Sequence, residues 1–224
     1  MADNLSPAFT PQSQLAFFGY ASILLSVLFL AILILLHFLK PELQPRWRMI
    51  SEYEIGRFGW MMRSAFFCWG ASALSLLIVL WPSLAYTGGI TGRWWFVLIA
   101  MALFGAGIFK TNAITDNTSN PANTLHALCG AIVILTFPIA ATLVRGSLLQ
   151  NNPWQMARGQ LTFGTVLAWL GMVSFFASII ISRIIDPSAG RVGPRVYLGW
   201  PNRFMVLTYI IWLILVANTA VRIT

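Results

Sequence analysis

The chain has 224 residues, of which 58% are apolar and only 9% are charged, and its mean hydropathy is +0.77. Water-soluble domains are about 45–50% apolar, so this composition excludes an ordinary soluble domain and indicates an integral membrane protein. The net charge of +8 would suit nucleic acid, but the cations are spread over short loops. We therefore expect them to face anionic lipid headgroups and no nucleic acid.

Long apolar segments predict an all-α, polytopic bundle of six transmembrane helices, forming one membrane domain over residues 1–224. The segments are close in length to the ~20 residues that cross the ~30 Å hydrocarbon layer, and they lack the alternation of barrel strands. The first is too long for a signal peptide and no Lys or Arg precedes it, so we expect it to be retained. The predicted helices cover residues 15–39, 60–82, 94–109, 123–144, 161–185 and 203–221.

Basic residues are concentrated around the loops that follow the first, third and fifth helices. The positive-inside rule places these loops in the cytoplasm and both termini on the non-cytoplasmic side. We therefore expect a multi-pass protein of the plasma membrane, which would be the inner membrane in a bacterium. The basic residues on the cytoplasmic side are Lys40, Arg46, Arg48, Arg57, Lys110, Arg183, Arg191, Arg195 and Arg203, against Arg93, Arg145, Arg158 and Arg222 on the other side.

The polar segment between the first two helices holds the densest group of chemically active side chains. Ser51 and Glu54 have the spacing of a capping box, which predicts that the second helix begins near Ser51. Glu52 and Tyr53 are not needed for this cap, and Arg63 lies about one turn into the second helix. An ionisable residue inside a span is a functional candidate, although the sequence favours a snorkelling or carboxylate-paired structural role for Arg63.

Other polar residues fall on the same side of the predicted bundle. Asp116 and His126 flank the start of the fourth helix, and Arg203 begins the sixth. His126 is interpreted either as a hydrogen-bonded structural residue or as a functional one. Cys68 and Cys129 are expected to pack as small apolar side chains, because two cysteines without paired histidines make neither a disulfide framework nor a zinc site. We expect no metal site.

His37 and His126 allow one cofactor hypothesis, a haem held between the first and fourth helices by two histidines. Haem ligands in helical bundles usually lie deeper, and nothing else in the sequence marks a haem cleft. The tryptophans at the helix ends are typical of the aromatic belt at a membrane interface rather than of a cofactor pocket. We therefore expect no cofactor.

The sequence around several of these residues resembles that of the bacterial six-helix membrane family catalogued as domain of unknown function 998 (DUF998). The most specific element is the Ser-Glu-Tyr-x-x-Gly-x-x-Gly-Trp run at residues 51–60, and the likeness extends through residues 109–116 and 126–128 to Arg203. Where the family has a Phe-Pro-Thr-Asp turn, this chain has Phe-Lys-Thr-Asn, with Asp116 four residues later. The resemblance implies no particular activity, but a fold-level likeness to eukaryotic proteins of lipid remodelling and autophagy favours lipids.

The leading hypothesis is a lipid-handling protein with a cytoplasmic-side pocket for an anionic headgroup. Arg63 and Arg203 would bind the phosphate, with Tyr53 and Asp116 beside them. In an enzyme version, His126 or Glu52 would act as general base and Ser51 as nucleophile. The predicted pocket is lined by Glu52, Tyr53, Arg63, Asp116, His126 and Arg203.

Two alternatives from other classes stay open. A proton-coupled transporter would use the acidic residues and His126 as a relay into the bundle, but no carboxylate lies at the bilayer midplane, where transporters commonly bind their substrates. A non-catalytic accessory subunit would pack against a larger membrane complex or against a second copy of the chain. Both an enzyme and a non-catalytic protein are consistent with the sequence.

Overall fold

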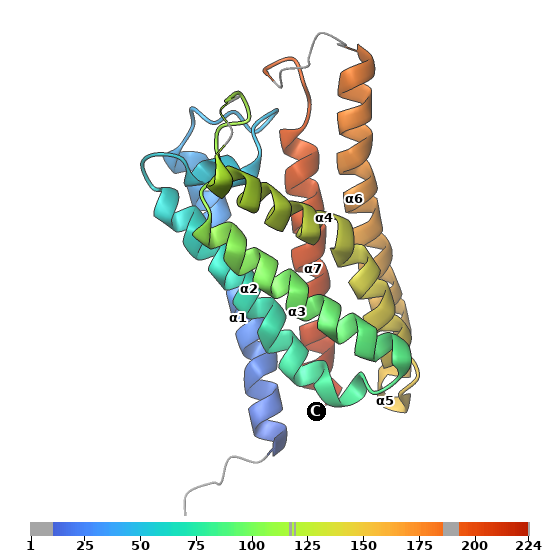
Figure 1. Cartoon of the computed structure of the whole chain (residues 1–224). Coiled ribbons are helices and arrows are strands. Elements are labelled where there is room, and N and C mark those ends of the chain that lie inside the picture. The colour runs from blue at the N-terminus through green and yellow to red at the C-terminus, as the bar shows by residue number, and fades with distance from the viewer. Residues whose placement is uncertain (1–10, 117, 119, 186–192, 224) are drawn as a thin grey trace, which may run out of the picture.

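The computed structural model describes residues 11–116, 118, 120–185 and 193–223, and this part of the chain is helical with no strand. Six long helices run between the two ends of the molecule (Figure 1). Each is long and apolar enough to cross a membrane, which confirms the predicted six-span fold. The elements are α1 (Pro11–Leu39), η1 (Ile50–Glu54), α2 (Gly59–Leu80), η2 (Trp81–Ser83), α3 (Thr87–Ile108), α4 (Pro121–Leu148), α5 (Asn152–Gln155), α6 (Arg158–Ile185) and α7 (Gly199–Ile223).

Most observed helix ends lie within about one turn of the predicted ends, and α3 is the exception. This helix begins at Thr87, about two turns before the predicted residue 94. The sequence obscures this start because glycines lower its helix propensity. In the structure, Gly89 and Gly92 are buried against the end of α4, close to Ser147 and Val144. Tertiary packing therefore extends the helix beyond its apolar core.

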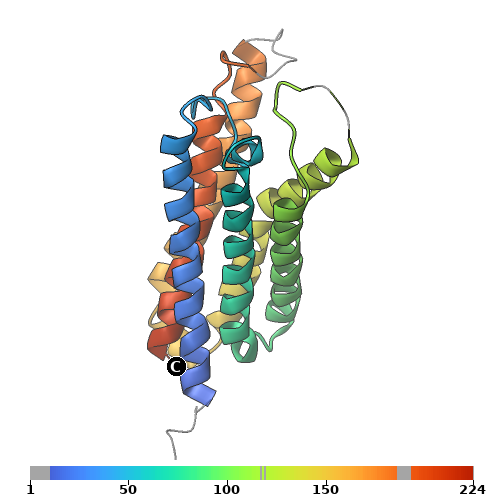
Figure 2. The same cartoon turned by 90° about the vertical axis from the view of Figure 1, so that its left-hand side faces the viewer.

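The buried centre of the bundle is built around α7. In its most apolar stretch 61% of the residues are buried, against 28% in α1 and in α6, which lie at the edges. Figure 2 shows α1 and α7 side by side, and α7 also contacts α2, α4 and α6. Aromatic rings join the layers, since Phe137 of α4 stacks on Tyr209 with centroids 4.3 Å apart and Phe96 of α3 stacks on Trp212 at 5.2 Å.

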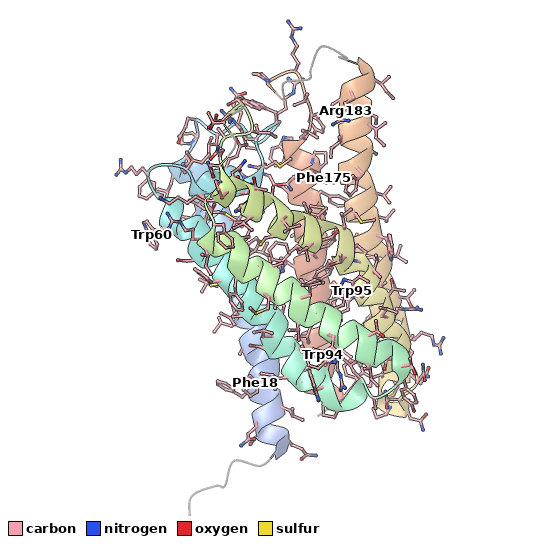
Figure 3. The ribbon with its side chains drawn as sticks, viewed as in Figure 1. Phe18, Trp60, Trp94, Trp95, Phe175 and Arg183 are labelled. Carbon is pink, nitrogen blue, oxygen red and sulfur yellow. The ribbon has the colours of Figure 1, made fainter. Side chains whose placement is uncertain are left out.

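Tryptophans lie at both ends of the bundle, as an aromatic belt requires. Trp60, near the start of α2, is 65% exposed, and Trp94, near the start of α3, is 58% exposed. Figure 3 shows these two side chains at opposite ends of the molecule. Amphipathic rings favour the two headgroup layers of a membrane, so their positions agree with six membrane-spanning helices.

A bend in α4 separates its first half from α6 (Figure 1). Pro138 lies in the middle of this helix and has no N–H, so the carbonyl of Ile134, four residues earlier, loses its helical partner. The phenol of Tyr209 donates a hydrogen bond to that carbonyl at 2.7 Å. The bend is therefore stabilised from α7, and it positions the cavity described below.

The polar connections collect at one end of the bundle. This end contains η1, the C-terminal ends of α1, α3 and α6, and the N-terminal ends of α2, α4 and α7 (Figure 1). The first described residues of α1 and the last of α7 lie at the opposite end, where Gly19 is close to Val221. We call the first end the loop end; its placement in the cytoplasm stays a prediction.

Candidate functional site

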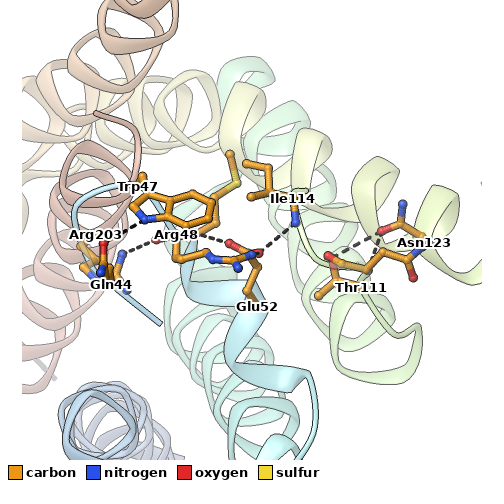
Figure 4. A network of polar contacts seen from close by, with 10 residues as sticks. Gln44, Trp47, Arg48, Glu52, Thr111, Ile114, Asn123 and Arg203 are labelled. Atoms are coloured by element: carbon orange, nitrogen blue, oxygen red, sulfur yellow. Dashed lines mark hydrogen bonds and ion pairs between the residues drawn. The ribbon is translucent and has the colours of Figure 1, made fainter. Parts of the chain in front are cut away.

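Glu52 connects two loops at the loop end (Figure 4). This carboxylate is 2% exposed, and it accepts hydrogen bonds from Arg48 at 2.6 Å, from the N–H of Met49 at 2.9 Å and from the N–H of Ile114 at 2.9 Å. The bond from Met49 is the capping interaction of η1. The predicted cap by Ser51 and Glu54 is therefore wrong. The acidic residue of a capping box needs only a backbone N–H three residues earlier, and Glu52 finds this N–H on Met49.

The second long helix also does not begin near Ser51, as the sequence suggested. η1 ends at Glu54, and the chain turns before α2 begins at Gly59. Gly56 and Phe58 adopt positive φ angles of 72° and 65° in this turn, a conformation that glycine takes most readily. A Cβ atom on Gly59 would overlap the carbonyl group of Glu54. Of the two glycines in the family-like run, Gly56 thus permits the turn and Gly59 permits the close approach of the backbone to Glu54.

Arg203 is a buried clamp, 7% exposed, whose donors are directed at protein groups. Its Nε donates to Nε2 of His37 at 2.7 Å, and Nη2 donates to the phenol of Tyr53 at 3.2 Å. Nη1 donates to the carbonyl oxygens of Arg48 at 2.7 Å and Gly199 at 2.9 Å, and more weakly to that of Pro45. Arg203 therefore ties the loop after α1 to the start of α7.

Glu54 faces the fourth helix instead of capping the second. Its side chain is buried, and Oε2 accepts the N–H of Thr111 at 3.2 Å and lies 3.6 Å from Nδ1 of His126. Oε1 is buried without a hydrogen-bond partner in the described structure. Burial raises the pKa of Glu54 to about 7, although the Thr111 N–H and the charges of Arg63 and Lys110 oppose the shift. This carboxyl can therefore exchange a proton near neutral pH.

His126 is 6% exposed, and its hydrogen bonds decide its tautomer. Nδ1 lies 2.8 Å from the carbonyl oxygen of Phe109 and 3.1 Å from that of Ala106. Both oxygens accept only, so the proton is assigned to Nδ1, and in the neutral ring Nε2 carries the lone pair. Across the described residues, Nε2 has no hydrogen-bond partner. The free nitrogen belongs to a side chain that lines a cavity.

This cavity has a volume of about 420 Å³ and lies between the first half of α4 and helices α2, α3, α6 and α7. Small residues of α4 create the space, because Ala127, Gly130 and Ala131 follow one another on one helix face. A Cβ atom on Gly130 would have no neighbour within 4 Å. Phe175 and Phe176 of α6 form part of its wall. The wall is mostly apolar.

The two ends of the cavity differ in chemistry. At the loop end it is lined by Ser51, Thr111, His126 and Asn202, and towards the middle of the bundle it reaches Tyr209 beside the bend of α4. Leu135, which also lines it, is 48% exposed. The cavity therefore borders the lipid-facing surface of α4 while its polar end lies near the loops.

The structure does not gather the predicted site residues around one pocket. Ser51 and His126 line the cavity, whereas Glu52, Tyr53 and Arg203 form the supporting loop network.

Arg63 and Asp116 lie outside both groups. Arg63 is half-buried on α2, and its positive charge opposes the rise in the pKa of Glu54. Asp116 is exposed, accepts the N–H of Thr118, and does not line the cavity. That hydrogen bond lowers the pKa of Asp116. The binding and catalytic roles of these residues stay predictions.

Three residues that the sequence did not single out also shape the site. The sequence assigned Glu54 only to a cap. In a 3₁₀ helix residues i and i+3 share a face, so Glu54 lies on the same face of η1 as Ser51. Asn202 accepts the N–H of Ile50 at 3.1 Å and lines the cavity. Lys40 is 4% exposed and donates to backbone carbonyls of the same loop. Burial lowers the pKa of Lys40, and no local sequence signal indicates its inward position.

The geometry argues against the two-histidine haem hypothesis. His37 donates from Nδ1 to the carbonyl oxygen of Leu33 at 2.7 Å, and its Nε2 accepts from Arg203. Both ring nitrogens are therefore occupied, and binding iron would disrupt the Arg203 clamp. Within the described ranges, no three His, Cys, Asp or Glu side chains lie close enough to hold a metal ion.

The family model described as a protein of unknown function (DUF998) matches residues 23–219, which is most of the chain and includes η1, His126 and Arg203. No curated protein and no solved structure matches the chain.

Proposed function

The chain belongs to the DUF998 family of unknown function, and we propose that it binds a membrane lipid in the cavity beside the first half of α4. The main observation in support of this proposal is the cavity itself. Its volume of about 420 Å³ lies within the range of about 300–1,000 Å³ that is typical of small-molecule sites, and its apolar wall with a few polar groups is also typical.

The position of the cavity favours a lipid over a water-soluble ligand. Leu135 lies at its edge and is exposed on the surface of a membrane-spanning helix. An amphiphile that enters from the membrane would place its chain along Phe175 and Phe176 and its head near Ser51 and His126. The positive-inside rule predicts that this site lies towards the cytoplasmic side.

The same arrangement would also serve catalysis if the lipid is a substrate. His126 would be the general base, because Nε2 carries the lone pair in the neutral ring. Glu54, 3.6 Å from Nδ1, would be the carboxylate behind it in place of Glu52. Ser51, whose hydroxyl has no hydrogen-bond partner among the described residues, would be the nucleophile.

Native mass spectrometry of the gently solubilised protein tests lipid binding. Gly130→Leu would fill the cavity, whereas Gly146→Leu is a matched control, because it lies on the same helix with open space around its Cβ. We expect a discrete lipid adduct in the wild type and in Gly146→Leu, and at least a five-fold lower occupancy in Gly130→Leu. A Gly130→Val variant provides a smaller filling group if leucine impairs folding.

An unchanged adduct in the Gly130 variants, or no discrete adduct in the wild type, would contradict the proposal. A protein partner that co-purifies at fixed stoichiometry from a lipid-free preparation would instead favour the accessory-subunit alternative. Proton-coupled uptake in liposomes that is unaffected by filling the cavity would favour the transporter.

A further inference from the structure

The cavity is lined by no Asp, Glu, Lys or Arg within the described chain. Arg203 lies beside its polar end, but its guanidinium is directed at carbonyl oxygens, His37 and Tyr53. Arg63 does not line the cavity. A buried charge without a partner is costly, so a phosphate or ammonium head would lack a counter-charge here. The cavity therefore does not fit the anionic headgroup that the sequence suggested.

Three groups at the polar end of the cavity are instead free to hydrogen-bond a ligand, and together they offer both an acceptor and a donor. His126 offers the lone pair of Nε2, because its proton is assigned to Nδ1. Asn202 accepts the Ile50 N–H with Oδ1, so its NH₂ group is the free half of the amide. Ser51 adds a hydroxyl that can donate or accept. None of these three groups has a further hydrogen-bond partner in the described part of the chain.

These free polar groups determine which lipid the cavity prefers, because the apolar tail of a lipid contributes little to the preference. A lipid tail leaves a hydrocarbon environment that is already as apolar as leucine, so entering the cavity gains little from the hydrophobic effect. A polar head that pairs with the free groups of the cavity wall gains more, since sites with unmet hydrogen bonds reject ligands that leave them unpaired. Preference among lipids should therefore follow the head.

Building on the proposed function, we infer that the cavity selects a lipid with an uncharged hydroxyl head. The hydroxyl hydrogen donates to Nε2 of His126, and its oxygen accepts from the NH₂ group of Asn202. One oxygen atom thus satisfies one acceptor and one donor. A phosphate would present only acceptors to Nε2, and a trimethylammonium head would present neither group.

Probes with the same chain and different heads test this inference. Myristyl alcohol, myristyl phosphate and myristyltrimethylammonium are titrated into nanodisc-embedded protein at mildly alkaline pH. We expect the alcohol to bind at least tenfold more tightly than either charged probe. Asn202→Asp keeps the oxygen that faces Ile50 and replaces the donor with an acceptor, and His126→Leu removes Nε2. Each should weaken alcohol binding about five- to tenfold, as expected for one lost hydrogen bond of about 1 kcal/mol.

The outcomes separate this inference from the proposed function. If all probes bind equally and Gly130→Leu prevents all of them from binding, the cavity holds a lipid but does not select its head. If both Asn202→Asp and His126→Leu keep the alcohol preference, the head lies elsewhere and the inference is wrong. If no probe binds and Gly130→Leu matches Gly146→Leu, lipid binding in the cavity itself is refuted.

Discussion

Glu52 and Glu54 lie two residues apart in one short helix, and their surroundings give them different roles. Glu52 accepts three hydrogen bonds, one of them from a guanidinium. Glu54 accepts one backbone N–H and faces a histidine, and one of its oxygens is buried without a partner. A desolvated carboxyl with few donors holds its proton more tightly, which is the situation of Glu54. The structural role of Glu52 and the titratable character of Glu54 follow from this contrast.

Glu54→Gln should change how stability depends on pH. The folded protein binds the Glu54 proton more tightly than the unfolded chain, because its pKa rises from 4.5 to about 7 on folding. Its contribution to stability is therefore fully present below about 4.5 and is lost as the pH rises through about 7. Thermal unfolding in detergent should show the wild type weakening relative to Glu54→Gln over this window, and parallel curves would contradict the assignment.

Arg203→Lys should destabilise the loop end, although the positive charge is kept. Lysine has three donors on one nitrogen, so it cannot reproduce the planar contacts to His37, Tyr53 and the carbonyl of Arg48. We expect a loss of about 2 kcal/mol or more in unfolding free energy, measured by denaturant titration in detergent. Arg222→Lys, on the exposed end of the same helix, is the control and should have little effect. Equal losses would refute the clamp.

At the scale of elements, the bend of α4 makes room for the cavity. A straight helix would keep the Ile134 carbonyl in its own ladder, but Pro138 removes that bond and Tyr209 replaces it from α7. The bend therefore depends on two helices that are distant in the sequence. Small residues in the first half of α4 then leave space where larger side chains would fill it.

A double-mutant cycle tests this account. Tyr209→Phe should cost about 1 kcal/mol, the usual size of a hydrogen bond inside a membrane protein, because it leaves the Ile134 carbonyl unpaired. In a Pro138→Ala background the restored N–H can pair with that carbonyl, so the same substitution should cost much less. Unfolding free energies of the four proteins measure the coupling, and additive effects would show that the phenol does not replace the missing helical bond.

At the scale of the whole molecule, the six helices place all the polar loops of interest at one end. Because the number of spans is even, the two described ends of the chain lie together at the other end. The distribution of Lys and Arg then predicts the side of the membrane on which each end lies. The same rule therefore predicts the side of the membrane on which the polar end of the candidate cavity lies.

Cysteine labelling in intact cells should reveal the orientation. With Cys68 and Cys129 replaced by alanine, Glu42→Cys lies at the loop end and Gln150→Cys lies beyond α4 at the opposite end, and both positions are exposed. A membrane-impermeant maleimide should label Gln150→Cys directly and Glu42→Cys only after permeabilisation. The reverse pattern would invert the predicted topology.

The fold was largely predictable, and the site was predictable only in part. His126 and Ser51 do line the cavity. The position of His126 was predictable because a polar residue near the start of an apolar helix faces inward to avoid lipid. Arg63, Asp116 and Arg203 do not line the cavity with them, and the sequence reveals neither the rotation of a helix about its axis nor the path of a loop. Glu54 was missed because η1 is a 3₁₀ helix, and its register differs from that of the α-helix the sequence suggested.

The sequence by itself determined that this is a six-helix membrane protein with its polar residues at one end, because the hydrocarbon layer imposes length and apolarity on each span separately. Only the tertiary structure decided which polar groups meet. Arg203 reaches His37, Tyr209 reaches the Ile134 carbonyl, and Glu54 reaches His126 across contacts that join distant segments. Such contacts depend on how the helices turn and bend against one another, and no local stretch of sequence contains that information.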